Sequence, residues 1–345
     1  MQKVVQADQN VVDEVERTKW KRTLQNLAKD WRLYVLLIPM LLFLVLFKYM
    51  PIKGIITGFK WGDDNDILYN AQWAGFYWLE YIFAGAAAGQ FWTSFRNTFV
   101  NSMYGLIFGF PIPIILALLF SEVKNAHYRS FLQVSCYLPH FVSTVVVATL
   151  LRLWAQGPSG SFEGGAMYQM FNNLGWNVLD DGETVSNVGI FVHPKFFRPI
   201  YQVSGIWEGA GYGSIVYFAA ILAISPTSYE AARIDGASKL QQIRYVTFPG
   251  MAPTLTIMLI TRIGHILNIG YEKIILLVED SKTSWETADV LSTYVYRMSG
   301  KSAAEGITPV AQVGIVMDLF NAIIAMMLVL GANAISRRVS STSLF

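Results

Sequence analysis

The sequence predicts an all-α integral membrane protein with six transmembrane helices. Of its 345 residues, 53% are hydrophobic and only 14% are charged, whereas a soluble domain carries about 25% charged residues. The long apolar runs approach about 20 residues, which suits a membrane-spanning helix and is too long for a barrel strand. One polar segment, 225–250, divides two of these runs and indicates a water-facing connection between spans.

The first 32 residues are predicted to form a cytoplasmic segment with an amphipathic helix at the membrane surface. Trp20, Leu24, Leu27 and Trp31 recur on one helical face, and five basic side chains flank that stripe. A helix of this kind lies in the bilayer interface, and packing against a partner subunit is the alternative. A long polar stretch precedes the first apolar run, so we expect no cleavable signal peptide.

Six apolar runs are the predicted spans, covering residues 33–52, 99–120, 131–154, 200–224, 252–278 and 310–335. Pro111 and Pro113 are expected to kink the second span, and Pro139 the third. The connections expected to be exposed are 53–96, 155–198 and 279–307. The glycines expected to serve close helix packing are Gly105, Gly109, Gly205, Gly209, Gly211 and Gly213.

An even number of spans places both termini on one side of the membrane, and the basic residues identify that side. The segment 1–32 carries seven Lys and Arg, whereas the connections 155–198 and 279–307 carry two and three. Cytoplasmic segments are enriched in Lys and Arg. Both termini, the tail 336–345 and the segment 225–250 are therefore predicted to be cytoplasmic.

The polar segment 225–250 reads SPTSYEAARIDGASKLQQIRYVTFPG and predicts two short helices separated by a break. Ser228 is a suitable N-cap for the first helix. Gly236 accepts a positive φ without strain, so a turn is expected there. Ser238 can cap the second helix, and Pro249 is expected to end it.

Polar and aromatic side chains inside the predicted spans mark a candidate substrate path. Ionisable residues in a membrane are costly and usually face a cavity or a partner. In an unbroken helix over 252–278, the polar residues from Arg262 to Lys273 would fall on one side, roughly 140° wide. The candidates for the path are Trp207, Glu208, Tyr212, Arg262, His265, Asn268, Glu272 and Asp318.

This residue set suits a sugar, because aromatic rings stack on the apolar face of a pyranose and carboxylates and amides bind its hydroxyl groups. A structural role is the alternative, in which Arg262 pairs with Asp318 or Glu272 and only holds helices together. A transporter driven by an ion gradient also stays open as a hypothesis, since the same charged face would suit proton coupling.

Motifs for other chemistry are missing or incomplete. Cys136 is the only cysteine, and the four histidines show no metal-ligand spacing. Gly300, Lys301 and Ser302 resemble the end of a nucleotide-binding Walker A motif, but Val295 stands where its first glycine belongs. The net charge of +2 is too small to indicate nucleic acid binding. The chain is therefore predicted not to be an enzyme.

The order of residues in the polar segment resembles the coupling signature of ABC importer permeases. That signature is Glu-Ala-Ala, three residues, Gly, nine residues and Ile-x-Leu-Pro. The chain reads EAARIDG, nine further residues and VTFP, so Val246 and Phe248 replace the Ile and the Leu. Further stretches, such as DWRLYVLLIPMLLFLVLFKYMPIKGIITGFK and ETADVLSTYVYR, look like the permeases of bacterial importers for complex oligosaccharides and polysaccharide fragments. That group is similar to the maltose-transporter permeases.

The resemblance implies a type I importer fold in the bacterial cell membrane, with a cytoplasmic coupling helix that docks on an ATPase subunit. It also implies a second homologous permease chain, two ATPase subunits and an extracellular sugar-binding protein, commonly a lipoprotein. We expect no cofactor in this chain, because ATP and Mg²⁺ would bind the ATPase subunits. A peptide, amino acid or ion is the alternative cargo. The implied coupling residues are Glu230, Ala231, Ala232, Asp235, Gly236 and Pro249.

Overall fold

The computed structural model describes most of the chain, and most of the described residues are helical. Outside the helices, this part holds two isolated antiparallel bridges, Lys60 with Trp73 and Ser159 with Phe162. Of the four apolar residues expected on the N-terminal amphipathic helix, Trp31 alone lies within the described residues. The described ranges are 29–61, 71–159, 161–175, 189–192, 194–278, 285–305 and 310–339.

The part of the chain that ends at Gly58 forms a compact unit of its own. Its described residues form one helical run, in which α2 (Trp31–Leu44) continues through a π-helical turn (Val45–Tyr49) into a 3-10 helix (Met50–Phe59). The most apolar window of this run has a mean hydropathy of 2.3 and buries none of its residues within the protein. A surface this apolar is suited to contact with lipid. The run contains the predicted first span.

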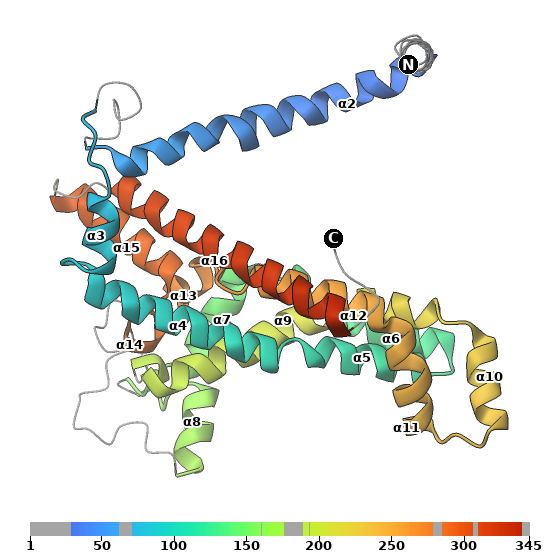
Figure 1. Cartoon of the computed structure of the whole chain (residues 1–345). Helices are drawn as coiled ribbons and strands as arrows, with labels where there is room; N and C mark the ends of the chain where they lie inside the picture. Colours follow the sequence, from blue (N-terminus) through green and yellow to red (C-terminus); the bar gives the residue numbers. More distant parts are fainter. Residues whose placement is uncertain are drawn as a thin grey trace, which may run out of the picture. The chain divides into compact units, whose positions relative to one another are not determined.

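The second unit, which begins at Phe59, is a bundle of helices. Its order is α3 (Tyr77–Phe83), α4 (Ala88–Ile107), α5 (Pro111–Glu122), α6 (Ala126–Tyr137), α7 (Thr144–Ala155), α8 (Ala166–Asn173), α9 (Pro194–Leu222), α10 (Pro226–Ile234), α11 (Lys239–Gln242), α12 (Phe248–Gly264), α13 (Glu272–Leu277), α14 (Trp285–Ala288), α15 (Leu291–Glu305) and α16 (Val310–Val339). Within this unit, α10 and α11 lie at one end, whereas α3, α14 and α15 lie at the other (Figure 1).

Four helical runs among the described residues are long and apolar enough to cross a membrane. Two further helix pairs pass the same test but are bent at a break, by 89° between α6 and α7 and by 69° between α9 and α10. The protein is therefore a multi-pass membrane protein with four spans, or up to six if each bent pair counts as one. The four runs that pass the test on their own are Trp31–Phe59, Ala88–Glu122, Lys239–Gly264 and Gln312–Arg338.

Prolines lie at two of the helix interruptions in the bundle. Pro111 begins α5 directly after the turn that follows α4. Pro139 lies in a 3-10 turn, Leu138–Phe141, between α6 and α7. Proline lacks the N–H that an α-helix interior needs, and its ring clashes with the preceding turn. The chain bends by 89° between α6 and α7, so the kink expected at Pro139 is present. At Pro111 a turn separates α4 from α5, but the two helices still form one run, Ala88–Glu122.

Helix α9 lies at the centre of the bundle and packs against α4, α5, α6 and α12. One apolar cluster joins α7, α9 and α13 around Phe197 and Ile274, both fully buried. A second joins α3, α4, α15 and α16 around Phe91 and Tyr294. A third joins α5, α9 and α12 around Met251. These clusters fix the helices whose polar residues form the candidate site.

The continuous helix expected over 252–278 is interrupted. Helix α12 ends at Gly264, where the N–H of His265 bonds the carbonyls of Thr261 and Arg262, both at 3.2 Å. A non-helical stretch follows, and α13 starts only at Glu272. Glycine ends helices readily because it loses more backbone entropy in them than other residues. The prediction of a single polar face on this span is therefore wrong, although several of its polar residues still line one cavity.

A buried ion pair ties the chain between α13 and α16 to the rest of the bundle. The carboxylate of Asp289 pairs with Arg297 of α15 and accepts hydrogen bonds from Ser94 of α4 at 3.0 Å and from Thr293 at 2.9 Å. Its side chain is only 7% exposed. The Arg297 guanidinium lies over the ring of Trp285, 4.4 Å from the ring centroid. The stretch ETADVLSTYVYR is thus anchored through its polar side chains.

This pair predicts a pH dependence of stability. Burial raises the pKa of the Asp289 carboxyl above its ordinary value, although Arg297 acts in the opposite direction. With a raised folded-state pKa, the stability linked to this group is complete below its unfolded-state pKa and declines as the pH rises through the folded-state pKa. We expect the melting temperature of the purified protein to fall over the pH interval just above the ordinary aspartate range. Asp289→Asn should flatten that interval, and an unchanged profile in the variant would contradict the assignment.

Candidate functional site

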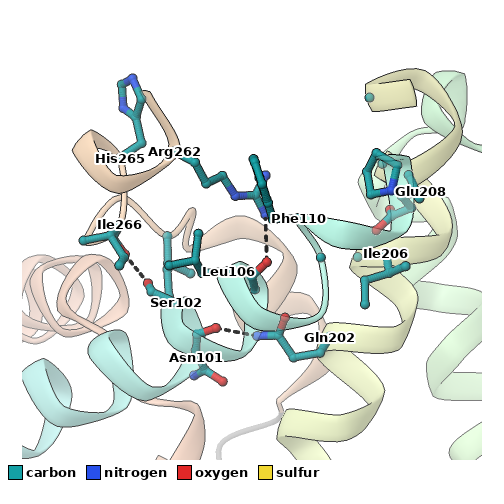
Figure 2. Close-up of a pocket in the computed structure, with 18 of the residues that line it drawn as sticks. Asn101, Ser102, Leu106, Phe110, Gln202, Ile206, Glu208, Arg262, His265 and Ile266 are labelled. Atoms are coloured by element: carbon teal, nitrogen blue, oxygen red, sulfur yellow. Dashed lines mark hydrogen bonds between the residues drawn. The ribbon is translucent and has the colours of Figure 1, made fainter. Parts of the chain in front are cut away.

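A cavity of about 540 Å³ lies between α4, α5, α9 and the C-terminal end of α12. Figure 2 shows side chains from these elements around it, with Arg262 and Glu208 on different walls. Four of the eight predicted path residues line this cavity, which are Glu208, Arg262, His265 and Asn268. The break after Gly264 carries His265 and Asn268 to the cavity wall, although they do not continue the helix of Arg262.

Glycines form much of the cavity wall on α9. A Cβ atom added at Gly205 or Gly209 would meet nothing within 4 Å, so these two positions face open space. Gly211 differs, because a Cβ there would collide with the backbone of Cys136. The packing role expected for these glycines therefore holds at Gly211, whereas Gly205 and Gly209 widen the cavity.

Arg262 presents its positive charge to this cavity. Its guanidinium donates a hydrogen bond to the carbonyl of Gly105 at 3.4 Å and takes part in none of the ion pairs found among the described residues. The proposed lock between Arg262 and Asp318 or Glu272 is therefore absent from this part of the chain. A guanidinium with one neutral acceptor keeps most of its donors available for a ligand.

Glu208 on the opposite wall is already engaged by a charge. The ammonium of Lys273, at the start of α13, pairs with its carboxylate. The side chains of Glu208 and Lys273 are 18% and 11% exposed, so the pair is largely shielded from bulk water. The Lys273 ammonium also lies 5.7 Å from the ring centroid of Tyr201. This pair holds α13 against α9 beside the cavity.

Removing one member of this pair is expected to cost more stability than removing both. Glu208→Gln leaves the Lys273 ammonium without a countercharge, and breaking a buried pair costs about 3–5 kcal/mol. Combining Glu208→Gln with Lys273→Met removes both charges and should recover most of the loss. Melting temperatures of the parent, the two single variants and the double variant measure this coupling. A double variant no more stable than the weaker single variant would show that the two charges do not depend on each other.

The other predicted path residues lie elsewhere. Trp207 and Tyr212 are 54% and 46% exposed and are not part of the cavity wall. The Tyr212 ring stacks on His140, with 4.0 Å between the ring centroids. Glu272 is exposed at the start of α13 and lines neither this cavity nor the one described next. Asp318 lines a second cavity of about 300 Å³, which shares Asn268 with the first.

Several lining residues were not among the sequence candidates. Gln202 of α9 donates to the backbone carbonyl of Asn101 at 2.7 Å, and Ser102 donates to the carbonyl of Ile266 (Figure 2). Asn101 and Gln202 carry polar amide side chains within apolar stretches, and this pattern could have identified them as candidates from the sequence. These bonds hold α4 against α9 and against the stretch that follows α12.

The polar segment that carries the EAA sequence forms a helix, a turn and a second helix. The first helix, α10, begins at Pro226 with Ser225 as N-cap, so the expected cap at Ser228 is wrong. Pro226 has a fixed φ suited to the first helical turn, which explains the earlier start. Gly236 has a φ of +76°, and Ser238 caps α11 in a capping box with Gln241, as predicted.

Pro249 does not end the second helix. A π-helical turn, Ile243–Thr247, joins α11 to α12, and Pro249 lies in the first turn of α12. Proline is tolerated at the start of a helix, where its missing N–H is not needed. The span after the turn at Gly236 is therefore one run, Lys239–Gly264, in which α11 leads directly into the membrane helix.

The surface of α10 is open. None of its residues is buried, and the expected coupling residues are exposed except for Ala232, which is half-buried. Two contacts connect this region to the membrane helices. The Tyr229 hydroxyl lies 3.0 Å from the Thr247 hydroxyl, and the Lys239 ammonium lies 2.6 Å from the Glu122 carboxylate at the end of α5.

A helical membrane bundle with a polar cavity and one exposed helix pair is suited to a transport permease. The chain matches the family of binding-protein-dependent transport system inner membrane components over residues 109–337, and it belongs to that family. Such a protein works with a substrate-binding protein and an ATPase, as the family description and the ABC permeases among its relatives imply.

Individual relatives agree with this assignment. The chain is 31% identical over 345 residues to the polygalacturonan/rhamnogalacturonan transport system permease protein YteP of Bacillus subtilis (strain 168), covering 99% of this chain and 100% of that protein. It is 37% identical to a chain in the crystal structure of a bacterial ABC transporter involved in the import of the acidic polysaccharide alginate, with a TM-score of 0.75 and coverage of 93% and 100%. A bacterial alginate ABC transporter in complex with an alginate pentasaccharide-bound periplasmic protein gives 36% identity and the same TM-score, covering 93% of this chain and 99% of that one.

Proposed function

We propose that this chain is the permease subunit of an ABC importer that moves an oligosaccharide or polysaccharide fragment into the cell. The observation that carries the proposal is the likeness over nearly the whole chain to permeases of polysaccharide importers. Family membership favours ATP-driven import over the ion-coupled alternative. The named relatives favour a sugar over a peptide, an amino acid or an ion.

In this proposal the cavity of about 540 Å³ forms part of the sugar path. Arg262 offers several donors and an uncompensated positive charge, His265 and Asn268 offer further hydrogen-bonding groups, and the glycines of α9 leave room. A sugar that carries a carboxylate would gain a charge-assisted hydrogen bond from Arg262. A second permease chain is proposed to complete the lining of this cavity.

The exposed helix α10 is proposed to dock on an ATPase subunit. Glu230 and Asp235 supply acceptors, and Ala231 and Ala232 allow close approach. Closure of the ATPases would then push α10, and the contact between Tyr229 and Thr247 would pass the movement to α12. Since α12 ends at the cavity wall, this route links the ATPase to the sugar path.

The complete assembly is proposed to hold a second homologous permease, two ATPase subunits that bind ATP and Mg²⁺, and an extracellular sugar-binding protein. ATP hydrolysis would then take place outside this chain. Both termini and α10 are proposed to face the cytoplasm, because the basic residues of these segments favour that orientation. In the bundle, α10 lies at the opposite end from α3, α14 and α15 (Figure 1).

Reconstitution tests this proposal. The purified transporter in liposomes, supplied with its binding protein and a labelled alginate or polygalacturonan oligosaccharide, is expected to accumulate sugar only when ATP is present on the ATPase side. Each component is then left out in turn. Accumulation by this chain alone, driven by a proton or sodium gradient, would overturn the proposal.

A further inference from the structure

The second cavity, of about 300 Å³, lies between α15, α16 and the stretch that follows α12. It shares Asn268 and Ile269 with the larger cavity, so the two spaces adjoin. Ser292 of α15 donates to the carbonyl of Ile269 at 2.6 Å, which fixes the wall between them. A volume of this size is at the lower end of the range for small-ligand pockets.

Two tyrosines form an aromatic surface in this cavity. Tyr271 and Tyr296 stack with 5.0 Å between their ring centroids and an angle of 18° between the ring planes. Their side chains nevertheless stay 40% and 49% exposed. A rigid ring pair that remains accessible can pack against the apolar face of a flat ligand at small entropic cost.

Two acceptors in the same cavity lack partners. Asp318 of α16 is exposed and takes part in none of the ion pairs found in the described residues. One turn along the helix, the side-chain oxygen of Asn321 is buried without a hydrogen-bond partner. A carboxylate inside a membrane span is costly, and buried acceptors are normally satisfied. The Asp318 carboxylate is thus accessible to a hydrogen-bond donor, and the Asn321 oxygen lacks one.

We propose that the second cavity is a sugar subsite. One pyranose unit stacks on the pair Tyr271 and Tyr296 and donates its hydroxyls to Asp318 and Asn321, while the neighbouring units of the same oligosaccharide occupy the larger cavity past Asn268. A sugar satisfies both the apolar ring surface and the unpaired acceptors, whereas a lipid chain satisfies only the rings. This inference rests on the proposed sugar cargo and predicts that the importer discriminates by chain length.

The test compares uptake along a length ladder. The complete transporter with its binding protein is supplied with alginate and polygalacturonan oligosaccharides of increasing length. Tyr296→Ala is expected to lower uptake of the longer chains about tenfold, to leave the shortest nearly unchanged, and to leave basal ATPase activity intact. Asp318→Asn should weaken the same lengths. Tyr296→Phe retains the ring stack and should behave like the parent, as should Tyr128→Ala, which removes an exposed tyrosine that lines neither cavity.

Several results would overturn the subsite. One is that Tyr296→Ala and Asp318→Asn import each oligosaccharide length as fast as the parent does. Another is that these variants lose uptake equally at every length and also lose basal ATPase activity. The Arg262→Ala variant separates the two cavities: if it has no effect while Tyr296→Ala removes the long chains, the larger cavity is misassigned and the subsite stands. A parent transporter that imports neither ladder would overturn both proposals.

A labelling experiment tests the alternative that the partner permease fills this cavity. Tyr296→Cys is introduced into a chain in which Cys136, the one free cysteine, is replaced by Ser. A polar maleimide should label this cysteine in the assembled transporter, and bound oligosaccharide should slow the labelling. Labelling that is equally slow with and without sugar would show that protein covers the cavity and would overturn the proposal.

Discussion

Replacing Gly236 with Val is expected to abolish ATP-driven uptake while the chain still inserts in the membrane. Gly236 has a φ of +76°, a conformation that β-branched residues resist. A Cβ there would meet no atom within 4 Å, so the effect must come from the backbone. Strain of this kind costs about 1–3 kcal/mol, which corresponds to a population change of about 5- to 150-fold. The angle between α10 and α11 should change, and α10 should no longer meet the ATPase.

The control for this prediction is Gly236→Asn. Asparagine tolerates the left-handed conformation better than other non-glycine residues, so this variant should retain most of the uptake. Insertion is followed by the amount of protein in the membrane fraction, and assembly by co-purification of the ATPase subunits. Full uptake by Gly236→Val would remove the argument that this turn sets the direction of α10.

Replacing Gly209 with Trp is expected to block the sugar path without unfolding the bundle. Position 209 faces the larger cavity, and a Cβ there would meet nothing within 4 Å. A tryptophan side chain therefore enters the cavity and does not strain the helix packing. Uptake should fall at least about 100-fold, whereas the melting temperature and basal ATPase activity should stay near the parent values, because ATP is hydrolysed elsewhere.

The matched control is Gly331→Trp on α16. A Cβ at Gly331 also meets nothing within 4 Å, yet this exposed position lines neither of the two cavities. This variant should transport normally. If Gly209→Trp transports as fast as Gly331→Trp, sugar does not pass through this cavity.

Features with a local cause could be predicted from the sequence. The turn at Gly236 follows from its freedom to adopt a positive φ, and the cap at Ser238 follows from a side chain that bonds the backbone three residues on. The start of α5 at Pro111 and the bend at Pro139 have an equally local cause. Each depends on the residue and its nearest neighbours, so no tertiary information is needed.

Features set by competition between neighbours were mispredicted. Pro249 could end one helix or begin the next, and the π-helical turn before it decides for the second. The stretch after Gly264 is apolar enough for a span, but two glycines, Gly264 and Gly270, flank a non-helical segment there. Hydropathy averages over this break, so a window of about 20 residues cannot detect it.

The candidate site needed long-range contacts that sequence order does not contain. Glu208 and Lys273 come from different helices and form the pair that flanks the cavity. The tyrosine pair of the second cavity joins Tyr271 to Tyr296 of α15, although α13 and α14 lie between them in the sequence. The residue type alone identified Arg262 and Asn268 as polar groups within a membrane span. The stacking of the Tyr212 ring on His140, in contrast, can be seen only in the folded structure.

This chain is proposed to carry the sugar path and to receive its movement through α10 from an ATPase. A photo-crosslinking amino acid at Glu230, in the assembled transporter in its native membrane, tests this most directly. We expect a crosslink to the ATPase subunit, with a yield that changes when ATP is bound and hydrolysed. A crosslink to the extracellular binding protein, or labelling of position 230 by a membrane-impermeant reagent added outside the cell, would contradict it.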